Sequence, residues 1–147
     1  MFQHASERHE LGVVVDQPPL FRNRGLPAWQ ARRITSFVAE NLEQRLTVAE
    51  LARHVSLSDG QFCRVFKQTF GVTAHAYVMC SRIRAAQTLM LSSGKTLSEI
   101  AVCCGMSDQS HFTRWFRRVV GETPYSWRRR HPHPPVAHWR LRASVCS

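Results

Sequence analysis

Acidic residues are scarce in this chain of 147 residues. There are 10 Asp and Glu against 20 Lys and Arg, which gives a formal net charge of +10 at pH 7. This imbalance favours a polyanionic partner, because cationic side chains that contact phosphates release condensed counterions. Lysine is rare too, so arginine carries the charge and can donate two parallel hydrogen bonds. A GC-rich genome produces the same arginine bias, so the bias itself carries little weight.

Long apolar runs and metal-type cysteine spacings are also missing. The first 20 residues hold no apolar stretch long enough for a secretion signal, and no run approaches the ~18 residues of a membrane span. The five cysteines are odd in number and include no CxxC pair. We therefore expect no membrane association and reduced thiols in a cytosolic protein. The adjacent pair Cys103-Cys104 is expected to pack within a helix, since no activating charge lies near it in the sequence.

The residue sets of common catalysts are absent. The chain has no Ser-His-Asp set, no paired carboxylates, no glycine-rich phosphate loop and no clustered zinc ligands. Three histidines near the C-terminus (His131, His133 and His138) and Cys146 have nothing to fix a metal geometry. We therefore expect no enzymatic activity, no cofactor and no metal site.

What the chain does contain is one unit twice. Thr47-Val-Ala-Glu50 recurs as Thr96-Leu-Ser-Glu99, an offset of 49 residues. After one inserted residue the offset becomes 50, and five further matches follow: Phe62, Arg64, Phe66, Gly71 and Thr73 recur as Phe112, Arg114, Phe116, Gly121 and Thr123. So many matches in one order indicate a duplicated structural unit.

Each copy predicts two short helices joined by a tight turn. Thr47/Glu50 and Thr96/Glu99 are capping boxes, in which the threonine accepts from the N3 amide and the glutamate reaches back. The following turn contains Ser56 in the first copy and Gly105 in the second. A positive φ suits Gly105 there and suits Ser56 less well.

The second helix of each copy has start and stop signals as well. Ser58 caps it in the first copy, and Ser107 or Asp108 caps it in the second. Gly71 and Gly121 are placed as C-caps. Two short helices joined in this way form a helix-turn-helix.

Residues 73–92 join the copies as a linker helix. Its apolar positions are Tyr77, Ile83, Ala86, Leu89 and Met90. Roughly 18 residues span about 27 Å, and one turn of B-DNA is about 34 Å. A helix of this length could set two reading heads into successive major-groove segments.

The remaining boundaries follow from composition. Residues 1–25 are expected to be a flexible arm, 26–72 the first lobe, 93–130 the second lobe and 131–147 a basic flexible tail. A leading helix over about 27–42 is expected to cover the first lobe with these apolar residues: Trp29, Ile34, Phe37, Val38 and Leu42.

The second helix of each copy has one apolar face and one polar face. Helical periodicity points Phe62, Val65 and Phe66 inward in the first copy, and Phe112, Trp115 and Phe116 inward in the second. The opposite faces carry Gly60, Arg64 and Lys67, then Ser110, Arg114 and Arg117. An exposed arginine is usually only a solvated group, but Arg64 and Arg114 recur at matching places in both copies.

The polar faces suit DNA. Arginine can pair bidentately with guanine and glutamine with adenine. Base reading is expected from seven residues: Gln61, Arg64, Gln109, Ser110, His111, Thr113 and Arg114. Phosphate contacts are expected from five: Ser58, Lys67, Arg117, Arg118 and Arg128. Gly60 and Cys63 give the first helix fewer reaching side chains, so the second lobe is expected to supply most of the specificity.

The second copy resembles the long C-terminal signature of the AraC/XylS family of bacterial transcription regulators. The matching positions are Ile100-Ala101, Gly105, Asp108, Ser110-His111-Phe112, Arg114, Phe116-Arg117, Gly121, Thr123-Pro124 and Trp127-Arg128. Tyr77, Arg82-Ile83, Ala86 and Leu89-Met90 resemble its linker helix, and the resemblance extends over about 26–130. Met106 stands where an aromatic is usual and Ala74 where a proline is usual, and both positions concern packing rather than DNA contact.

The resemblance implies an all-α fold of about seven helices, with two helix-turn-helix subdomains joined by a long linker helix. Our hypothesis is a regulator of the bacterial cytosol that activates or represses transcription, with activation favoured, and that binds double-stranded DNA as a monomer. Activators of this family commonly contact RNA polymerase, which is therefore a candidate partner. The resemblance supports Arg64, Gln109, His111, Thr113 and Arg114 as reading positions. Only about 25 residues precede the first helix, so we expect a stand-alone regulator or one that lost its sensor domain.

Two alternatives from other classes stay open. Similar modules accompany DNA-repair alkyl-transfer domains, so the chain could be the DNA-targeting part of an enzyme. It could also be a non-specific or remnant DNA-binding module, which would bind in a salt-dependent manner without discriminating between sequences.

Overall fold

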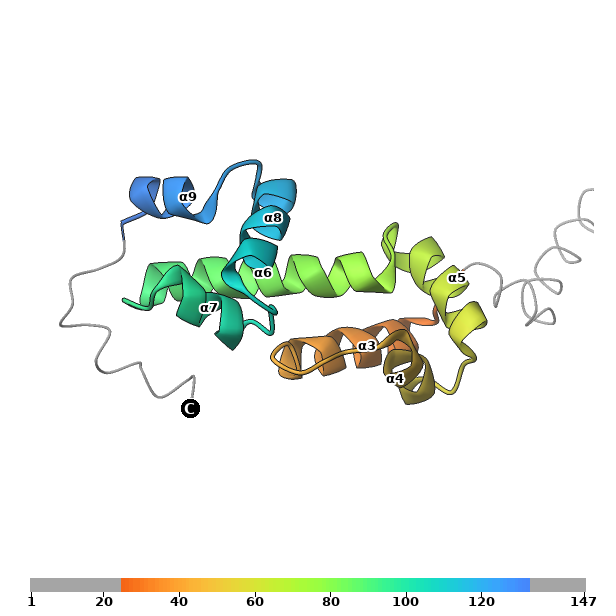
Figure 1. Cartoon of the computed structure of the whole chain (residues 1–147). Helices are drawn as coiled ribbons and strands as arrows, with labels where there is room; N and C mark the ends of the chain where they lie inside the picture. The colour runs from red at the N-terminus through yellow and green to blue at the C-terminus, as the bar shows by residue number, and fades with distance from the viewer. Residues whose placement is uncertain (1–24, 133–147) are drawn as a thin grey trace, which may run out of the picture. The chain divides into compact units, whose positions relative to one another are not determined.

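The computed structural model describes residues 25–132, which form seven α-helices and no strand (Figure 1). In chain order these helices are α3 (Ala28–Glu40), α4 (Val48–His54), α5 (Asp59–Phe70), α6 (Ala74–Ser92), α7 (Leu97–Cys103), α8 (Gln109–Val120) and α9 (Pro124–Arg130). The all-α expectation is confirmed. The expected arm falls almost wholly, and the expected tail mostly, outside the described residues. Among the helices described, none is long and apolar enough to cross a membrane.

The described residues divide into two compact units. One unit holds residues 25–36 and 48–74, and the other holds 37–47 and 75–132. Residues 37–47 thus group with the second unit, whereas the boundaries expected from composition included them in the first lobe. Arg82 of α6 explains this, because its Nε donates to the Leu42 carbonyl (3.0 Å) and its Nη2 to the Gln44 carbonyl (2.7 Å).

The first unit buries the helical faces that periodicity predicts. Phe62 and Phe66 of α5 are completely buried, and their ring centroids lie 5.3 Å apart. They are joined in the core by buried residues of α4 and the turn after it, namely Leu51, Ala52 and Val55. Gln30 of α3 donates to the Val55 carbonyl at 3.2 Å, which ties α3 to the end of α4.

The second unit is built on α6. This helix contributes four buried residues at helical spacing, Met79, Ile83, Ala86 and Met90. The same core contains residues of α7, α8, α9 and the turn between α7 and α8: Ile100, Ala101, Cys104, Met106, Phe112, Phe116 and Trp127. Met106, which departs from the family pattern, is buried in this core. The core fixes α8 by one face and leaves its other face outside.

The turns inside the two helix pairs use the positive φ that the sequence predicts. Gly105 has φ +71° and Ser56 has φ +58°. Of these two residues, Gly105 also has a steric requirement, because a Cβ there would lie 2.3 Å from the Leu42 carbonyl oxygen. Gly71 and Gly121 end α5 and α8 in the left-handed conformation, as predicted.

The expectation for Trp29 was wrong. Its side chain is 55% exposed, whereas Ile34 and Val38 of the same helix are buried. At 100° per residue, Trp29 lies about 140° around the helix from Ile34, so the two cannot share one inward face. Apolar composition alone therefore does not predict which residues of this helix are buried.

Candidate nucleic-acid interface

The polar face of α5 is exposed. Arg64, Lys67 and Gln68 are all solvent-exposed, because Phe62, Val65 and Phe66 hold the other side of the helix in the core. Gly60 and Cys63 are exposed on the same helix, and neither has a long side chain. Two cations, Arg64 and Lys67, are therefore the longest charged groups that α5 can present to a polyanion.

The N-terminus of α5 is capped by Ser58, as predicted. The Ser58 hydroxyl accepts from the backbone amide of Gln61 at 3.4 Å and donates to the side-chain Oε1 of Gln61 at 3.1 Å. Both side chains were expected to contact DNA, Gln61 at a base and Ser58 at a phosphate. The structure uses the Gln61 oxygen in the cap, so bidentate pairing with adenine requires that this cap open.

The polar face of α8 carries more reaching groups than that of α5. Ser110, Arg114, Arg117 and Arg118 are exposed. Two further residues of α8 are expected to read bases, His111 and Thr113, and both are half-buried. Capping by Asp108 is as predicted, because its carboxylate accepts from the His111 amide at 2.7 Å. This hydrogen bond is the main reason why the pKa of Asp108 lies below its ordinary value.

Gln109, the first residue of α8, is exposed but engaged. Its Oε1 accepts from the Ser98 hydroxyl of α7 at 2.6 Å. This bond fixes the beginning of α8 on α7 and leaves the Gln109 amide nitrogen as a donor. Helix α8 is therefore held in place at its N-terminal end.

A groove of about 310 Å³ runs along α8, lined by His111, Arg114, Trp115 and Arg118. The Arg118 guanidinium lies over the Trp115 ring, 5.2 Å from its centroid, and His75 of α6 meets the same ring edge-on at 5.7 Å. His111 Nδ1 is buried in this region and has no hydrogen-bond partner. The groove therefore combines two cationic groups, an aromatic surface and an unsatisfied polar atom.

Trp115 meets the sequence expectation in part. It packs against the core that contains Phe112 and Phe116, as expected, but it is half-buried and also lines the groove. Its position between the phenylalanine stripe and the arginines could have indicated this, since a residue at the edge of an amphipathic face contacts both environments. His75, which lies on the linker helix, carries no comparable sequence signal.

Arg128, which is expected at a phosphate, also makes a contact within the protein. Its Nη2 donates to the Lys95 carbonyl at 2.7 Å, and its Nε is buried without a partner. Burial lowers the pKa of Arg128 from its ordinary value. One end of this guanidinium therefore fastens α9 to the loop before α7, while Lys67, Arg117 and Arg118 remain exposed.

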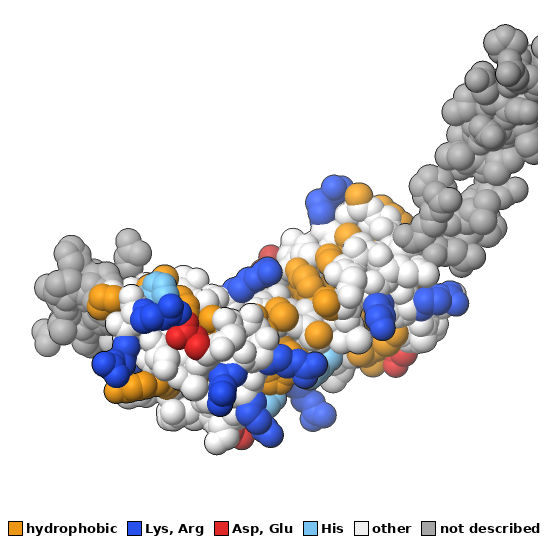
Figure 2. Space-filling view, turned by 90° about the horizontal axis from the view of Figure 1, so that it is seen from above, with side chains coloured by type: hydrophobic (Ala, Val, Ile, Leu, Met, Phe, Trp, Pro, Cys, Tyr) orange, Lys and Arg blue, Asp and Glu red, His pale blue; other side chains and the backbone are white. Residues whose placement is uncertain are grey.

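Cationic side chains are distributed widely over the surface. Figure 2 shows many Lys and Arg side chains and few Asp and Glu side chains on the face that it presents. Among the described residues, Arg130 forms a salt bridge with Glu122, so its positive charge is not unpaired. No group of three or more His, Cys, Asp or Glu side chains is arranged to hold a metal ion in the described part of the chain.

Comparisons with known proteins find relatives among transcription regulators. Residues 51–130 match a family described as a helix-turn-helix domain. The probable transcriptional regulator LumQ of Photobacterium leiognathi is 37% identical over 91 residues, which cover 62% of this chain and 37% of that protein. The bifunctional transcriptional activator/DNA repair enzyme AdaA of Bacillus subtilis is 30% identical over 95 residues, covering 65% of this chain and 45% of that protein. The matches thus span less than half the length of these relatives.

Solved structures share the arrangement of helices. An AraC-type DNA-binding domain-containing regulator of Chromobacterium violaceum has a TM-score of 0.66 and 27% identity, with 72% of this chain and 95% of that chain covered. The DNA-binding domain of AdpA, solved in complex with a target DNA, has a TM-score of 0.63 and 25% identity, with 79% and 96% covered. The fold is therefore that of proteins described as DNA-binding.

Proposed function

Since the chain belongs to the AraC/XylS family of DNA-binding regulators, we propose that it regulates transcription by recognising a specific sequence in double-stranded DNA. One observation carries this proposal. Arg64 and Arg114 occupy the same position of the repeat, and both are exposed on a helix whose other face is buried. Selection for solubility alone gives no reason for two guanidinium groups at matching places, whereas two major-groove contacts do.

The two helices are proposed to insert into adjacent major-groove segments. At 19 residues, α6 spans roughly 28 Å, which is close to the repeat of the DNA helix. Arg64 and Arg114 are assigned to base edges, with Gln61, Gln109, Ser110, His111 and Thr113 as further readers. Lys67, Arg117 and Arg118 are assigned to phosphates, with Ser58 and the remaining donors of Arg128.

The binding site is proposed to be asymmetric. The α8 face offers Ser110, Arg114 and the His111 edge of the groove, while the corresponding part of α5 offers Gly60 and Cys63 beside Arg64. Base contacts each contribute about 1–3 kcal/mol of discrimination, so the lobe with more reaching side chains contributes more specificity. Substitutions on α8 are therefore expected to change sequence preference more than those on α5.

The regulatory role is proposed from the relatives. Several of them are named as transcriptional activators, including AdaA and VirF of Yersinia enterocolitica. We assign this chain to the same role, acting in the bacterial cytosol as a monomer on DNA and contacting RNA polymerase. The repair activity in the name of AdaA belongs to that protein, while the family and fold of this chain are those of DNA-binding regulators.

Selection of bound duplexes from random DNA tests the proposal. At moderate salt, the protein should enrich an asymmetric motif of roughly 20 base pairs, made of two half-sites about one helical turn apart. Tight binding without any enriched motif would instead identify a non-specific DNA-binding module. Genome-wide mapping of bound sites, together with expression changes after induction, would then give the sign of regulation.

A further inference from the structure

The side chain at position 115 is larger than core packing requires. With the repeat offset of 50 residues, Trp115 of α8 corresponds to Val65 of α5, which is buried in the first unit. Trp115 packs against the core of the second unit, yet it is half-buried and lines the groove on α8. Since valine is sufficient for the core of one copy, the additional ring surface of Trp115 calls for another explanation.

Two side chains lie against the Trp115 ring. The Cζ of Arg118, which lies one helical turn later, is 5.2 Å from the ring centroid, a distance at which a cation is attracted to the face of an indole. His75 of α6 meets the ring edge-on, with centroids 5.7 Å apart and an interplanar angle of 66°. The charge of Arg118 is therefore held near a ring that is itself anchored on the core and on a second helix.

This contact leaves the hydrogen-bonding groups of Arg118 available. A guanidinium has five N–H donors, and the attraction to the ring depends on its positive charge instead. Among the residues that the structure describes, none accepts a hydrogen bond from Arg118 or forms an ion pair with it. Because Arg118 is also exposed, its donors can bind a phosphate through two parallel hydrogen bonds.

Both members of the contact differ between the two copies of the repeat. Gln68, which is exposed on α5, corresponds to Arg118, just as Val65 corresponds to Trp115. Arg117, by contrast, has a cationic counterpart in the first copy. The large ring thus occurs in the copy that has a cation one turn later, and it is missing from the copy that has a neutral side chain there.

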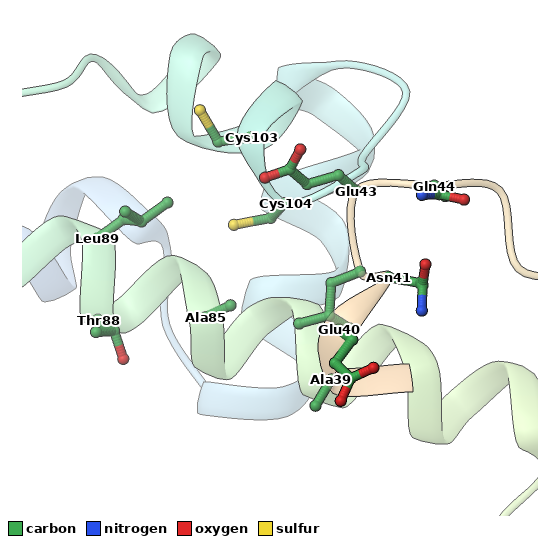
Figure 3. Close-up of a pocket in the computed structure, with 11 residues that line it drawn as sticks. Ala39, Glu40, Asn41, Glu43, Gln44, Ala85, Thr88, Leu89, Cys103 and Cys104 are labelled. Carbon is green, nitrogen blue, oxygen red and sulfur yellow. The ribbon is translucent and has the colours of Figure 1, made fainter. Parts of the chain in front are cut away.

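Charge distinguishes the groove on α8 from a second hollow of the same unit. A cavity of about 530 Å³ is lined by residues 39–44, by part of α6 and by the end of α7. Figure 3 shows the carboxylates of Glu40 and Glu43 among its side chains, and no Lys or Arg is among the described residues that line it. The described lining of the groove instead includes Arg114 and Arg118 and no acidic side chain. Of these two hollows, the groove is the one that attracts a phosphate.

We propose that Trp115 is a positioning residue that holds the Arg118 guanidinium ready to bind a DNA phosphate, an inference that rests on the proposed function. An unrestrained arginine populates many rotamers, and fixing one of them on binding costs conformational entropy. The contact with Trp115 restricts these rotamers before DNA is bound. The strength of an exposed cation–π contact limits the gain to roughly two- to five-fold in affinity.

A double-mutant cycle on DNA affinity tests this role. The full chain is compared with Trp115→Val, Arg118→Gln and the double variant, and both substitutions introduce the residue that the first copy carries. Trp115→Val should weaken binding roughly two- to five-fold when Arg118 is present and should have no effect in the Arg118→Gln background. Trp115→Leu, which keeps more apolar volume and also lacks a ring, should behave in the same way. Equal weakening in both backgrounds, as lost packing alone would give, overturns the proposal.

Arg117 provides the matched control for this cycle. It is an exposed arginine of α8 without a ring contact in the described part of the chain. Trp115→Val should therefore weaken binding by the same factor with and without Arg117→Gln. Coupling to Arg117 as strong as the coupling to Arg118 would indicate a general disturbance of α8 and would overturn the proposal.

The cycle is measured on a selected duplex and on a shuffled duplex. Because phosphates are common to all sequences, the coupling between Trp115 and Arg118 should be the same on both. Coupling confined to the selected duplex would assign Arg118 to a base and overturn the phosphate contact. A wild type that binds the two duplexes alike would refute the proposed sequence-specific function, and the coupling could still be read on either duplex, so the two failures are distinguishable.

Discussion

Replacing Gly105 with alanine tests the junction that holds the second helix-turn-helix in place. Gly105 has φ +71°, and an L-residue in this conformation costs about 1–2 kcal/mol. The added Cβ would also lie 2.3 Å from the Leu42 oxygen and 3.1 Å from the Glu43 oxygen. Residues 42–43 would have to retreat by roughly 1 Å to reach ordinary van der Waals contact.

That retreat acts on Arg82, which donates to the carbonyls of Leu42 and Gln44. A hydrogen bond to a charged group contributes roughly 1.5–3 kcal/mol. Losing one of them in addition to the backbone strain gives a loss of about 2.5–5 kcal/mol for Gly105→Ala. This is a large part of the roughly 5–15 kcal/mol by which domains are stable.

Gly121→Ala is the matched control, since Gly121 belongs to the same unit and has φ +94°, with nothing within 4 Å of an added Cβ. Backbone strain alone predicts a loss of about 1–2 kcal/mol there. Urea denaturation followed by circular dichroism measures both free energies of unfolding. Equal losses in the two variants would refute the proposed role of the contact between Gly105, residues 42–44 and Arg82.

Three further outcomes are expected from the same structure. Ser56→Gly should raise the free energy of unfolding by about 0.5–1 kcal/mol, because Ser56 has φ +58° and glycine removes that strain at some cost in unfolded-state entropy; a loss of stability in urea denaturation would contradict this. The pKa of Asp108 is lowered, mainly by the His111 amide, so its contribution to stability is full above the unfolded pKa of about 3.9 and disappears as pH falls through the folded pKa. In acid titrations of thermal stability, Asp108→Asn should therefore show a smaller acid-induced loss than wild type, and identical profiles would contradict the cap. Arg117→Ala should weaken binding to all duplexes alike and reduce the slope of log K against log salt by about 0.9; a changed base preference would argue against a phosphate contact.

Local features of the fold could be predicted from the sequence because local interactions create them. The Thr96/Glu99 capping box, the Ser58 and Asp108 caps and the glycine ends of α5 and α8 all involve residues within one helical turn. The exposure of Arg64 and Arg114 follows from periodicity, since the buried faces of their helices are defined by large aromatic residues. These features include the side chains on which the DNA-binding proposal rests.

Features that depend on distant parts of the chain could not be predicted in this way. Arg82 is charged and lies on a helix, a pattern typical of solvent exposure, yet its side chain is buried. Its guanidinium donates to a carbonyl 40 positions earlier in the chain, that of Leu42. Arg128 was expected at a phosphate, and its bond to the Lys95 carbonyl depends on how α9 packs.

The central claim is that matching guanidinium groups read bases, and one comparison of affinities tests it most directly. The dissociation constants for a selected duplex and for a shuffled duplex would be measured in wild type, Arg114→Ala and the control Arg129→Ala, whose residue is exposed on α9. The account predicts that Arg114→Ala reduces discrimination between the duplexes by about 1–3 kcal/mol, while Arg129→Ala leaves it unchanged. If Arg114→Ala weakened binding to both duplexes equally, Arg114 would not be reading sequence, and the account would be contradicted.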